Sequence, residues 1–204
     1  MNAREMDRFI AHCDKYLEQT DCTVLHPTVE GMPHIDILLY SPNEKYPFWK
    51  LITMGASDYK MPKLPVSLGN RNEYMMFVNS DEDLNDKNVL TWYHNTLMGI
   101  AHYPRAAKIA VTYAHSIEWG EDEDNQSDMV AAFLEMPQMI ENPDVLRCRL
   151  GLFKQVICLQ VITLTRAETD KLLKMGPQEF SSFLYPEDES APHYLCERFR
   201  TKNF

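Results

Sequence analysis

The chain has 204 residues, of which 45% are hydrophobic and 25% are charged, which is the composition of an ordinary globular protein and excludes a disordered or collagen-like chain. This length suits one domain with a single core. The 30 acidic and 20 basic residues give a net charge of −10, which argues against a nucleic-acid or membrane partner and favours binding to a basic protein.

The cysteines and the N-terminal segment predict a cytoplasmic protein. The 5 cysteines are odd in number, lie far apart and form no Cys-x-x-Cys pair, so neither a disulfide framework nor a zinc ribbon is expected. Residues 1–19 mix charges with apolar side chains, unlike a signal peptide, and no run of residues is long and apolar enough for a membrane helix. We expect the whole chain to be mature, soluble and not exported.

The N-terminal half predicts one helix and three strands. Apolar residues recur at helical intervals across residues 4–19, which indicates an amphipathic helix. Strand-like segments follow at residues 34–40, 46–54 and 72–78, and the first is apolar on both faces, as in a sheet that is covered on both sides. The short turn at residues 41–44 favours an antiparallel hairpin.

A second helix is expected after the acidic segment 81–86, which can supply an N-cap. Its apolar face includes Leu90, Tyr93 and Leu97, and Pro104 is expected to end it. From Ile109 to Glu118 the side chains alternate in character with a period of two, which predicts a strand.

The C-terminal part predicts strands at residues 128–136 and 154–164, followed by a helix. That helix begins at a capping box from Thr165 to Glu168 and ends at Gly176-Pro177. The element order predicts an α+β fold with a mixed, largely antiparallel sheet and helices packed on its faces. We expect one domain over residues 1–180, with a C-terminal tail at 181–204 that docks on it or is partly disordered.

Candidate catalytic residues are few. His34 and Asp36 share one face of a strand, as a metal site or an acid–base pair requires, but no third ligand at a matching spacing is apparent, so a polar pair is the preferred interpretation. A hydrolase that uses this pair is the rival hypothesis. Cys158 lies in an apolar strand and is expected to be an inert buried thiol. We therefore predict no catalytic residue, no metal and no cofactor.

The Gly55-Ala56-Ser57-Asp58 segment is expected to close a tight turn, because glycine accepts positive φ and Ser and Asp side chains bond nearby amides. Its position in a loop makes Asp58 and Tyr59 candidates for contact with a partner.

An acidic segment between two predicted strands is the second candidate binding surface. An acidic run is most often a solvated loop, and its spacing does not match a calcium-binding EF-hand. The alternative is a docking patch in which an aromatic anchor is surrounded by carboxylates that attract a basic partner. Its members are Glu118, Trp119, Glu121, Asp122, Glu123, Asp124 and Asp128.

The order and spacing of three segments resemble the Suppressor of fused (SUFU) domain family in its bacterial form. They are His34-Ile35-Asp36-Ile37, Leu51 to Asp58, and Asn72 to Val78. The strand and helix from Cys158 to Gly176 also resemble the closing part of the family. Ala56 departs from the pattern, since a bulkier apolar residue is commoner there.

The resemblance implies a protein-binding domain without a catalytic motif. Many bacterial members are thought to be immunity proteins that neutralise a toxin, so the resemblance implies an immunity protein that binds a basic toxin domain. A regulatory adaptor with an endogenous partner is the alternative.

Overall fold

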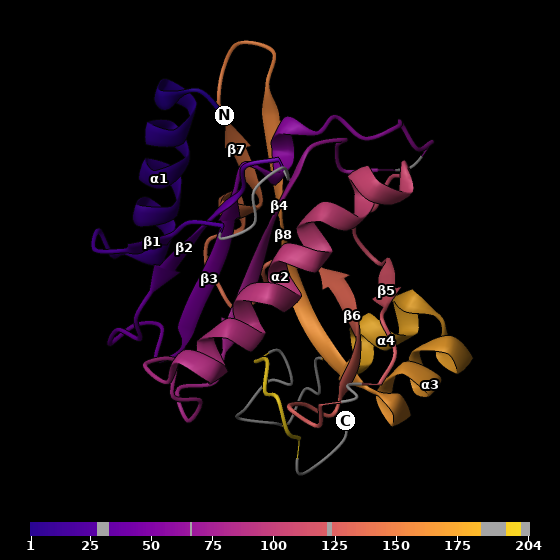
Figure 1. Ribbon diagram of the computed structural model, residues 1–204. Helices are drawn as coiled ribbons and strands as arrows, with labels where there is room; N and C mark the ends of the chain where they lie inside the picture. Colours follow the sequence, from indigo (N-terminus) through magenta and orange to yellow (C-terminus); the bar gives the residue numbers. More distant parts are fainter. Residues whose placement is uncertain (28–32, 66, 122–123, 185–194, 201–204) are drawn as a thin grey trace.

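The structure is a computed structural model, and it describes residues 1–27, 33–65, 67–121, 124–184 and 195–200. Within these residues, eight strands form one sheet (Figure 1). The strands are β1 (Thr23–Leu25), β2 (Asp36–Tyr40), β3 (Trp49–Met54), β4 (Asn72–Val78), β5 (Ser116–Glu118), β6 (Met129–Glu135), β7 (Arg147–Arg149) and β8 (Gln155–Thr165). The helices are α1 (Ala3–Leu17), α2 (Lys87–Ala107), α3 (Arg166–Met175) and α4 (Pro177–Phe183), with short 3-10 turns η1 (Ala56–Asp58) and η2 (Pro143–Leu146).

The sheet is mixed and mostly antiparallel. Its strand order is β1-β2-β3-β4-β8-β6-β5, and β7 pairs with the start of β8. Only β4 and β8 run parallel among the described pairs, with Tyr74 opposite Leu159. The predicted α+β class is confirmed, and so is the antiparallel hairpin of β2 and β3, in which Leu38 faces Ile52.

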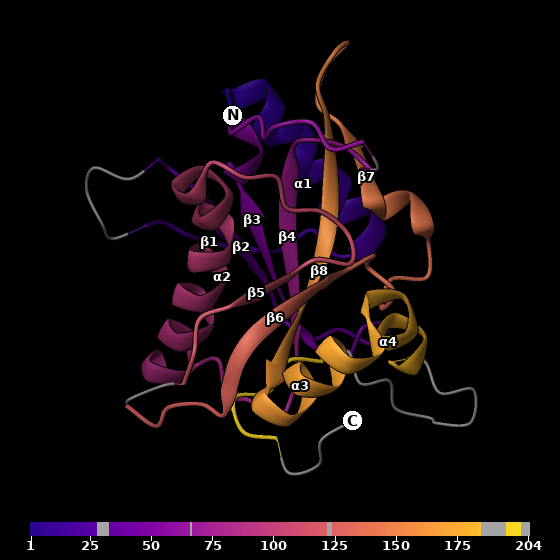
Figure 2. The same cartoon turned by 90° about the vertical axis from the view of Figure 1, so that its right-hand side faces the viewer.

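Helices cover both faces of the sheet, as the apolar strands predict (Figures 1 and 2). Helix α1 buries Phe9, Cys13 and Leu17, spaced one turn apart, against one face. Helix α2 crosses the other face and buries Tyr93 and Leu97. Both faces of the sheet therefore take part in the core.

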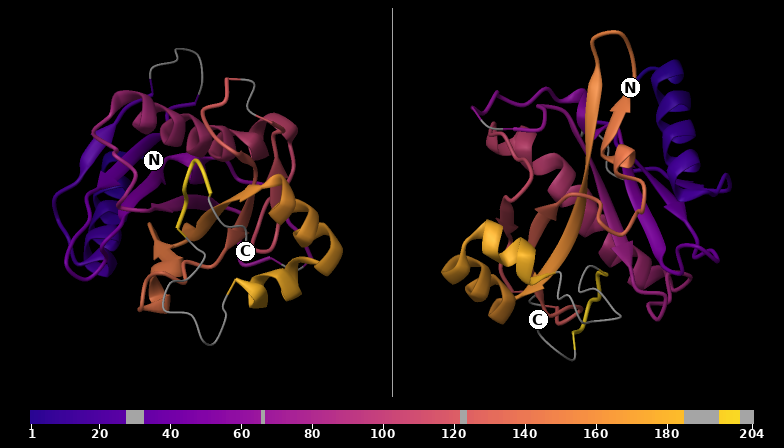
Figure 3. Two further views of the ribbon diagram at one scale, coloured as in Figure 1. Left: turned by 90° about the horizontal axis from the view of Figure 1, so that it is seen from below. Right: turned by 180° about the vertical axis from the view of Figure 1, so that it is seen from behind.

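Helices α3 and α4 pack on the same face as α1, towards the opposite end of β8 (Figure 3). Cys158 contacts the α1 cluster, whereas Ile162 and Leu164 contact the cluster formed with α3 and α4. These three residues are an even number of positions apart, so they lie on one face of the strand. The 11-residue β8 is long enough to support both groups of helices.

The predicted starts of α2 and α3 are confirmed, but the predicted end of α2 is wrong. Asp86 is the N-cap and accepts from the amide of Asn88 at 2.7 Å, and the Thr165–Glu168 capping box is present. Pro104, however, lies inside α2, which continues to Ala107. Proline in the last turn removes a single hydrogen bond, and Lys108 ends the helix instead with φ 57° and an amide bond to the Arg105 carbonyl.

The predicted strand over residues 109–118 is also wrong for most of its length, because only Ser116–Glu118 is a strand. Ala114 has φ 64°, and the His115 amide bonds back to the Thr112 carbonyl in a turn. This turn therefore interrupts the alternation of side chains before β5 begins and pairs with β6. The short strands β1 and β7 and the helix α4 carry too little periodicity to have been predicted.

Part of the C-terminal tail is described, and it is docked. Cys196 bridges to Val78 at the end of β4, and its amide donates to the Phe77 carbonyl at 2.7 Å. Arg200 and Glu168 form a buried ion pair at 3.0 Å. Among the described residues, no helix has the length and apolar character that a membrane span requires.

Candidate partner-binding groove

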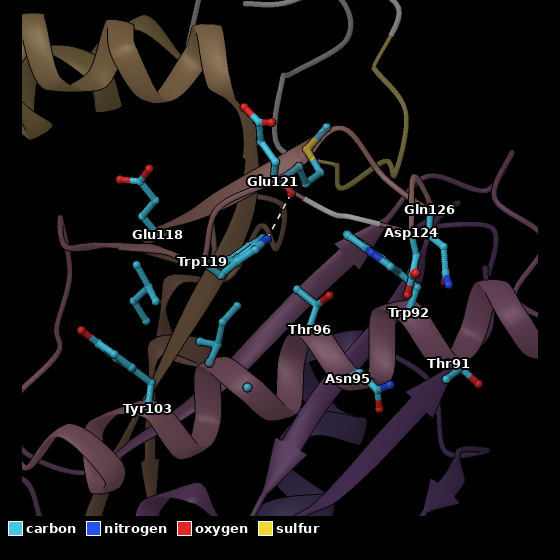
Figure 4. A pocket seen from close by; sticks show the side chains of 14 residues that line it. Thr91, Trp92, Asn95, Thr96, Tyr103, Glu118, Trp119, Glu121, Asp124 and Gln126 are labelled. Atoms are coloured by element: carbon cyan, nitrogen blue, oxygen red, sulfur yellow. Dashed lines mark hydrogen bonds between the residues drawn. The ribbon is translucent and has the colours of Figure 1, made fainter.

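A groove of about 610 Å³ runs between α2 and the segment that leads from β5 to β6 (Figure 4). Helix α2 supplies one wall with two rows of residues spaced four apart, which lie one above the other on a helix. The rows are Thr91, Asn95, Gly99 and Tyr103, and Trp92, Thr96 and Ile100. The other wall comes from Ile117, Glu118, Trp119, Glu121, Asp124, Gln126 and Met129.

The middle of the α2 wall is low because its side chains are small. A Cβ atom added at Gly99 would meet no atom within 4 Å, so the missing side chain leaves open space there. Thr96 and Asn95 are the neighbours of this position on the helix surface. Tyr93 and Leu97, on another side of α2, are buried against the sheet.

Three aromatic side chains line the groove. Trp119 is 41% exposed, and its indole Nε1 donates to the Met129 carbonyl at 3.1 Å, while its backbone amide donates to the Val130 carbonyl at 2.9 Å. Trp92 lines the groove from α2 near Asp124 and Gln126, and Tyr103, at the far end of the same helix wall, is 40% exposed. Anchored but accessible aromatic rings are typical of binding hot spots.

Carboxylates gather on the β5 side of the groove. Glu118, Glu121 and Asp124 line it and are exposed. Glu118 pairs with Arg166 at 2.5 Å, and both side chains are about half exposed. The predicted residues Asp122 and Glu123 lie outside the described residues. Even with Arg166 nearby, the three described carboxylates give this wall a negative charge.

Four of the nine predicted binding residues therefore meet in one groove, and three described ones lie elsewhere. Asp128 is exposed and its amide donates to the Arg198 carbonyl at 2.8 Å, but it does not line the groove. Asp58 pairs with Lys154 at 2.8 Å and with the amino group of Met1. Tyr59 stacks under Arg105 at 5.4 Å. Contact of Asp58, Tyr59 and Asp128 with a partner stays a prediction.

The ion pairs of Asp58 hold distant parts of the chain together. Lys154, which leads into β8, also contacts Glu5 of α1 at 3.0 Å. Burial alone would raise the pKa of the Asp58 carboxyl, but its hydrogen bonds to Lys154 and to the Met1 amino group outweigh burial and lower that pKa. Asp58 therefore has a structural task at the junction of α1, η1 and β8.

The turn at Gly55 is confirmed, and it encloses a buried carboxylate. Gly55 has φ 125°, and a Cβ there would lie 2.8 Å from the His34 carbonyl oxygen, so only glycine fits. The fully buried Glu73 carboxylate accepts from the amides of Gly55, Ala56 and Ser57 at 2.9, 3.2 and 3.0 Å and from the Thr53 hydroxyl at 2.6 Å. Burial raises the pKa of Glu73, and these hydrogen bonds oppose the shift.

Sequence reasoning missed Trp92 and Tyr103 as groove residues. Both lie in a helix whose apolar positions were assigned to the core, and nothing local says that the β5–β6 segment passes over them. The four-residue spacing of Asn95, Gly99 and Tyr103 was the available signal, since a glycine one turn away from an aromatic residue on one helix face indicates a hollow beside that residue.

Comparison with known proteins identifies the family and the fold. Residues 31–194 match the family described as Suppressor of fused protein (SUFU). The crystal structure of the Sufu–Fu complex is similar with a TM-score of 0.65 and 16% identity, over 94% of this chain and 88% of that chain. No curated protein matches the sequence.

Two further crystal structures have the same fold. Drosophila Suppressor of Fused is similar with a TM-score of 0.65 and 16% identity over 94% of this chain, which spans only 49% of the Drosophila chain. A SUFU homologue from Neisseria gonorrhoeae gives a TM-score of 0.61 and 15% identity, over 94% of this chain and 93% of that chain. At these identities the likeness shows the fold alone.

Proposed function

The chain belongs to the Suppressor of fused protein (SUFU) family, and from this premise we propose that it binds another protein through the groove between α2 and the β5–β6 segment. The observation that carries the proposal is the coincidence, in one hollow, of exposed aromatic rings with carboxylates. The Sufu–Fu structure supports it, because there the same fold is in complex with another protein. Binding, and not catalysis, is the function that we propose.

The occupant that fits this groove is a segment of a basic protein that carries Arg or Lys. Arg and Lys side chains can make cation–π contacts with Trp119 or Tyr103, and Glu121 and Asp124 can accept charge-assisted hydrogen bonds from them. The net charge of −10 attracts such a partner over a longer range. The proposed contact residues are thus Glu118, Trp119, Glu121 and Asp124, with Trp92 and Tyr103 added.

We further propose that the partner is a basic toxin domain, which the chain neutralises as a cytoplasmic immunity protein. The acidic groove and the family membership support this assignment. A toxin gene beside the gene for this chain would favour it, whereas a neighbourhood without one, together with a housekeeping protein bound in the groove, would favour the regulatory adaptor.

A single position can close the groove without touching the core. Gly99→Phe puts a ring into the open space above α2, and Gly99→Ala is the matched control, because a methyl group there meets no neighbour. The test first identifies a toxin gene beside the gene for this chain and then co-expresses each variant with the product of that toxin gene. We expect Gly99→Ala to protect cells as the native protein does, and Gly99→Phe and Trp119→Ala to weaken toxin binding by at least roughly thirtyfold, as for loss of a ~2 kcal/mol hot spot.

Circular dichroism and thermal unfolding check that each variant is folded. If folded Gly99→Phe and Trp119→Ala both bind the toxin with native affinity, the groove is not the binding site. If the toxin does not bind the native protein at all, the immunity assignment is wrong.

A further inference from the structure

Two histidines and an aspartate converge at the open ends of β1 and β2, away from the groove. His26 Nδ1 lies 2.8 Å and His34 Nε2 lies 2.9 Å from the same oxygen, Oδ1 of Asp36. All three ligand atoms lie within 4.8 Å of one another. The two imidazole rings are 6.1 Å apart between centroids.

Strand pairing brings these residues together. Leu25 of β1 lies opposite Ile37 of β2, so the next position in the antiparallel register places His26 beside Asp36. His34 precedes Asp36 by two residues and lies on the same side of the strand. The third ligand that the sequence did not reveal is thus His26, which comes from the neighbouring strand.

The carboxylate of Asp36 is buried, whereas the two imidazoles are exposed. Asp36 is 2% exposed, and it is held in place by the β2–β3 pairing opposite Met54. The side chains of His26 and His34 are 70% and 67% exposed. A fixed, buried carboxylate with two accessible imidazoles leaves the side that faces solvent open to an ion and to further ligands.

We infer that His26, His34 and Asp36 form a binding site for a divalent transition-metal ion of the Zn²⁺ type. Imidazole nitrogens and a carboxylate oxygen are the ligands that such ions take, at about 2.0–2.2 Å, which sets neighbouring ligand atoms about 3.3–3.6 Å apart in a tetrahedron. The distances of 2.8 and 2.9 Å to Asp36 need only a small outward shift of two exposed rings to reach that spacing. Three protein ligands leave at least one coordination position for water or an external group.

A cavity of about 340 Å³ adjoins this site and gives room for that external ligand. His34 and Asp36 line it together with Asp58 and Arg105. Arg105 stacks on Tyr59 and offers a counter-charge to an anion bound at the metal, as does the amino group of Met1, which also lines the cavity and pairs with Asp58. This inference does not depend on the partner-binding groove.

Titration of the metal-free, full-length protein with ZnCl₂ in a calorimeter tests the site. We expect one Zn²⁺ per chain, and a loss of affinity of roughly tenfold or more in His26→Ala and in His34→Ala. His94→Ala, in which the lost imidazole lies on α2, is the matched control and should bind as the native protein does. Asp36 is left intact, because its carboxylate is buried at the start of β2, which pairs with both β1 and β3.

Co²⁺ provides a second readout, since its visible absorption bands report a coordination sphere of nitrogen and oxygen ligands. The bands should appear at one equivalent in the native protein and in His94→Ala, and be absent in the two cluster variants. No saturable binding at one equivalent, or binding that is unchanged in both His26→Ala and His34→Ala, would overturn the inference and leave the cluster as a hydrogen-bonded group only.

Discussion

Lys50 is a residue whose position in β3 conflicts with its charge. Its side chain is fully buried, and the ammonium donates to uncharged acceptors, the Ser41 carbonyl at 2.7 Å and the Gln19 side chain at 3.2 Å, with the Phe48 ring 5.7 Å away. Burial lowers the pKa of Lys50 from 10.5 to about 8. The native state therefore loses this proton more easily than the unfolded chain does.

This shift predicts how stability depends on pH. Between about pH 8 and 10.5 the unfolded chain holds a proton that the native state has released, so rising pH favours the native state by up to about 3 kcal/mol from Lys50 alone. Urea unfolding of the native protein and of Lys50→Met across pH 7–10.5 measures the effect. The difference in unfolding free energy between them should change by that amount in favour of the native protein, and parallel curves would contradict the prediction.

Among the secondary-structure elements, helix α2 contains a glycine at position 99 that lowers the stability of the helix but leaves the groove open. Glycine inside a helix is less stable than alanine by about 1 kcal/mol, and nothing in the fold requires glycine there, because a Cβ would meet no neighbour. The residue that keeps the groove open is thus one that the helix itself does not favour. The binding role that we propose for the groove would account for such a choice.

Two glycine variants should accordingly move stability in opposite directions. We expect Gly99→Ala to raise the unfolding free energy by about 0.5–1 kcal/mol, since it removes backbone freedom from the unfolded chain. Gly55→Ala should lower it by more than 1 kcal/mol, because its Cβ would lie 2.8 Å from the His34 carbonyl oxygen at φ 125°. Denaturant titration of both variants checks this, and a loss of stability in Gly99→Ala would mean that the α2 wall is packed.

For the whole molecule, the proposed function predicts that charge governs how fast a basic partner arrives. The excess of acidic residues would attract such a partner, and the groove carboxylates would guide it to Trp119 and Trp92. Added salt screens both effects, since the Debye length falls to about 8 Å at physiological ionic strength. The association rate, more than the dissociation rate, should therefore depend on salt.

Neutralising the groove should slow association more than the same change in charge elsewhere. We expect replacement of Glu118, Glu121 and Asp124 by Gln and Asn to lower the association rate with the toxin roughly tenfold at low salt and to flatten its salt dependence. The matched control replaces three exposed carboxylates away from the groove, those of Asp7, Asp21 and Glu44, for the same net charge. Stopped-flow tryptophan fluorescence measures the rates, and equal slowing in both triple variants would show that the net charge alone steers the partner.

Much of the fold could be read from local patterns, and the errors have local causes. Strand β4 begins and ends at the predicted residues, and the capping box at Thr165 starts α3 as expected. The alternation from Ile109 to Glu118 led to the wrong prediction of one continuous strand, because a turn at Ala114, with φ 64°, interrupts it. Pro104 led to a predicted helix end that is too early, because the last turn of a helix tolerates the hydrogen bond that proline removes.

The sequence by itself determined the α+β class, the family resemblance and the acidic segment around Trp119, since periodicity, caps and charge runs depend on residues close together in the chain. Only the tertiary structure placed Trp119 and Trp92 in one groove, brought His26 to Asp36 and enclosed Glu73 in the Gly55 turn. Each of these arrangements joins segments on different elements. Their approach is set by how strands pair and how α2 packs on the sheet, which no local pattern encodes.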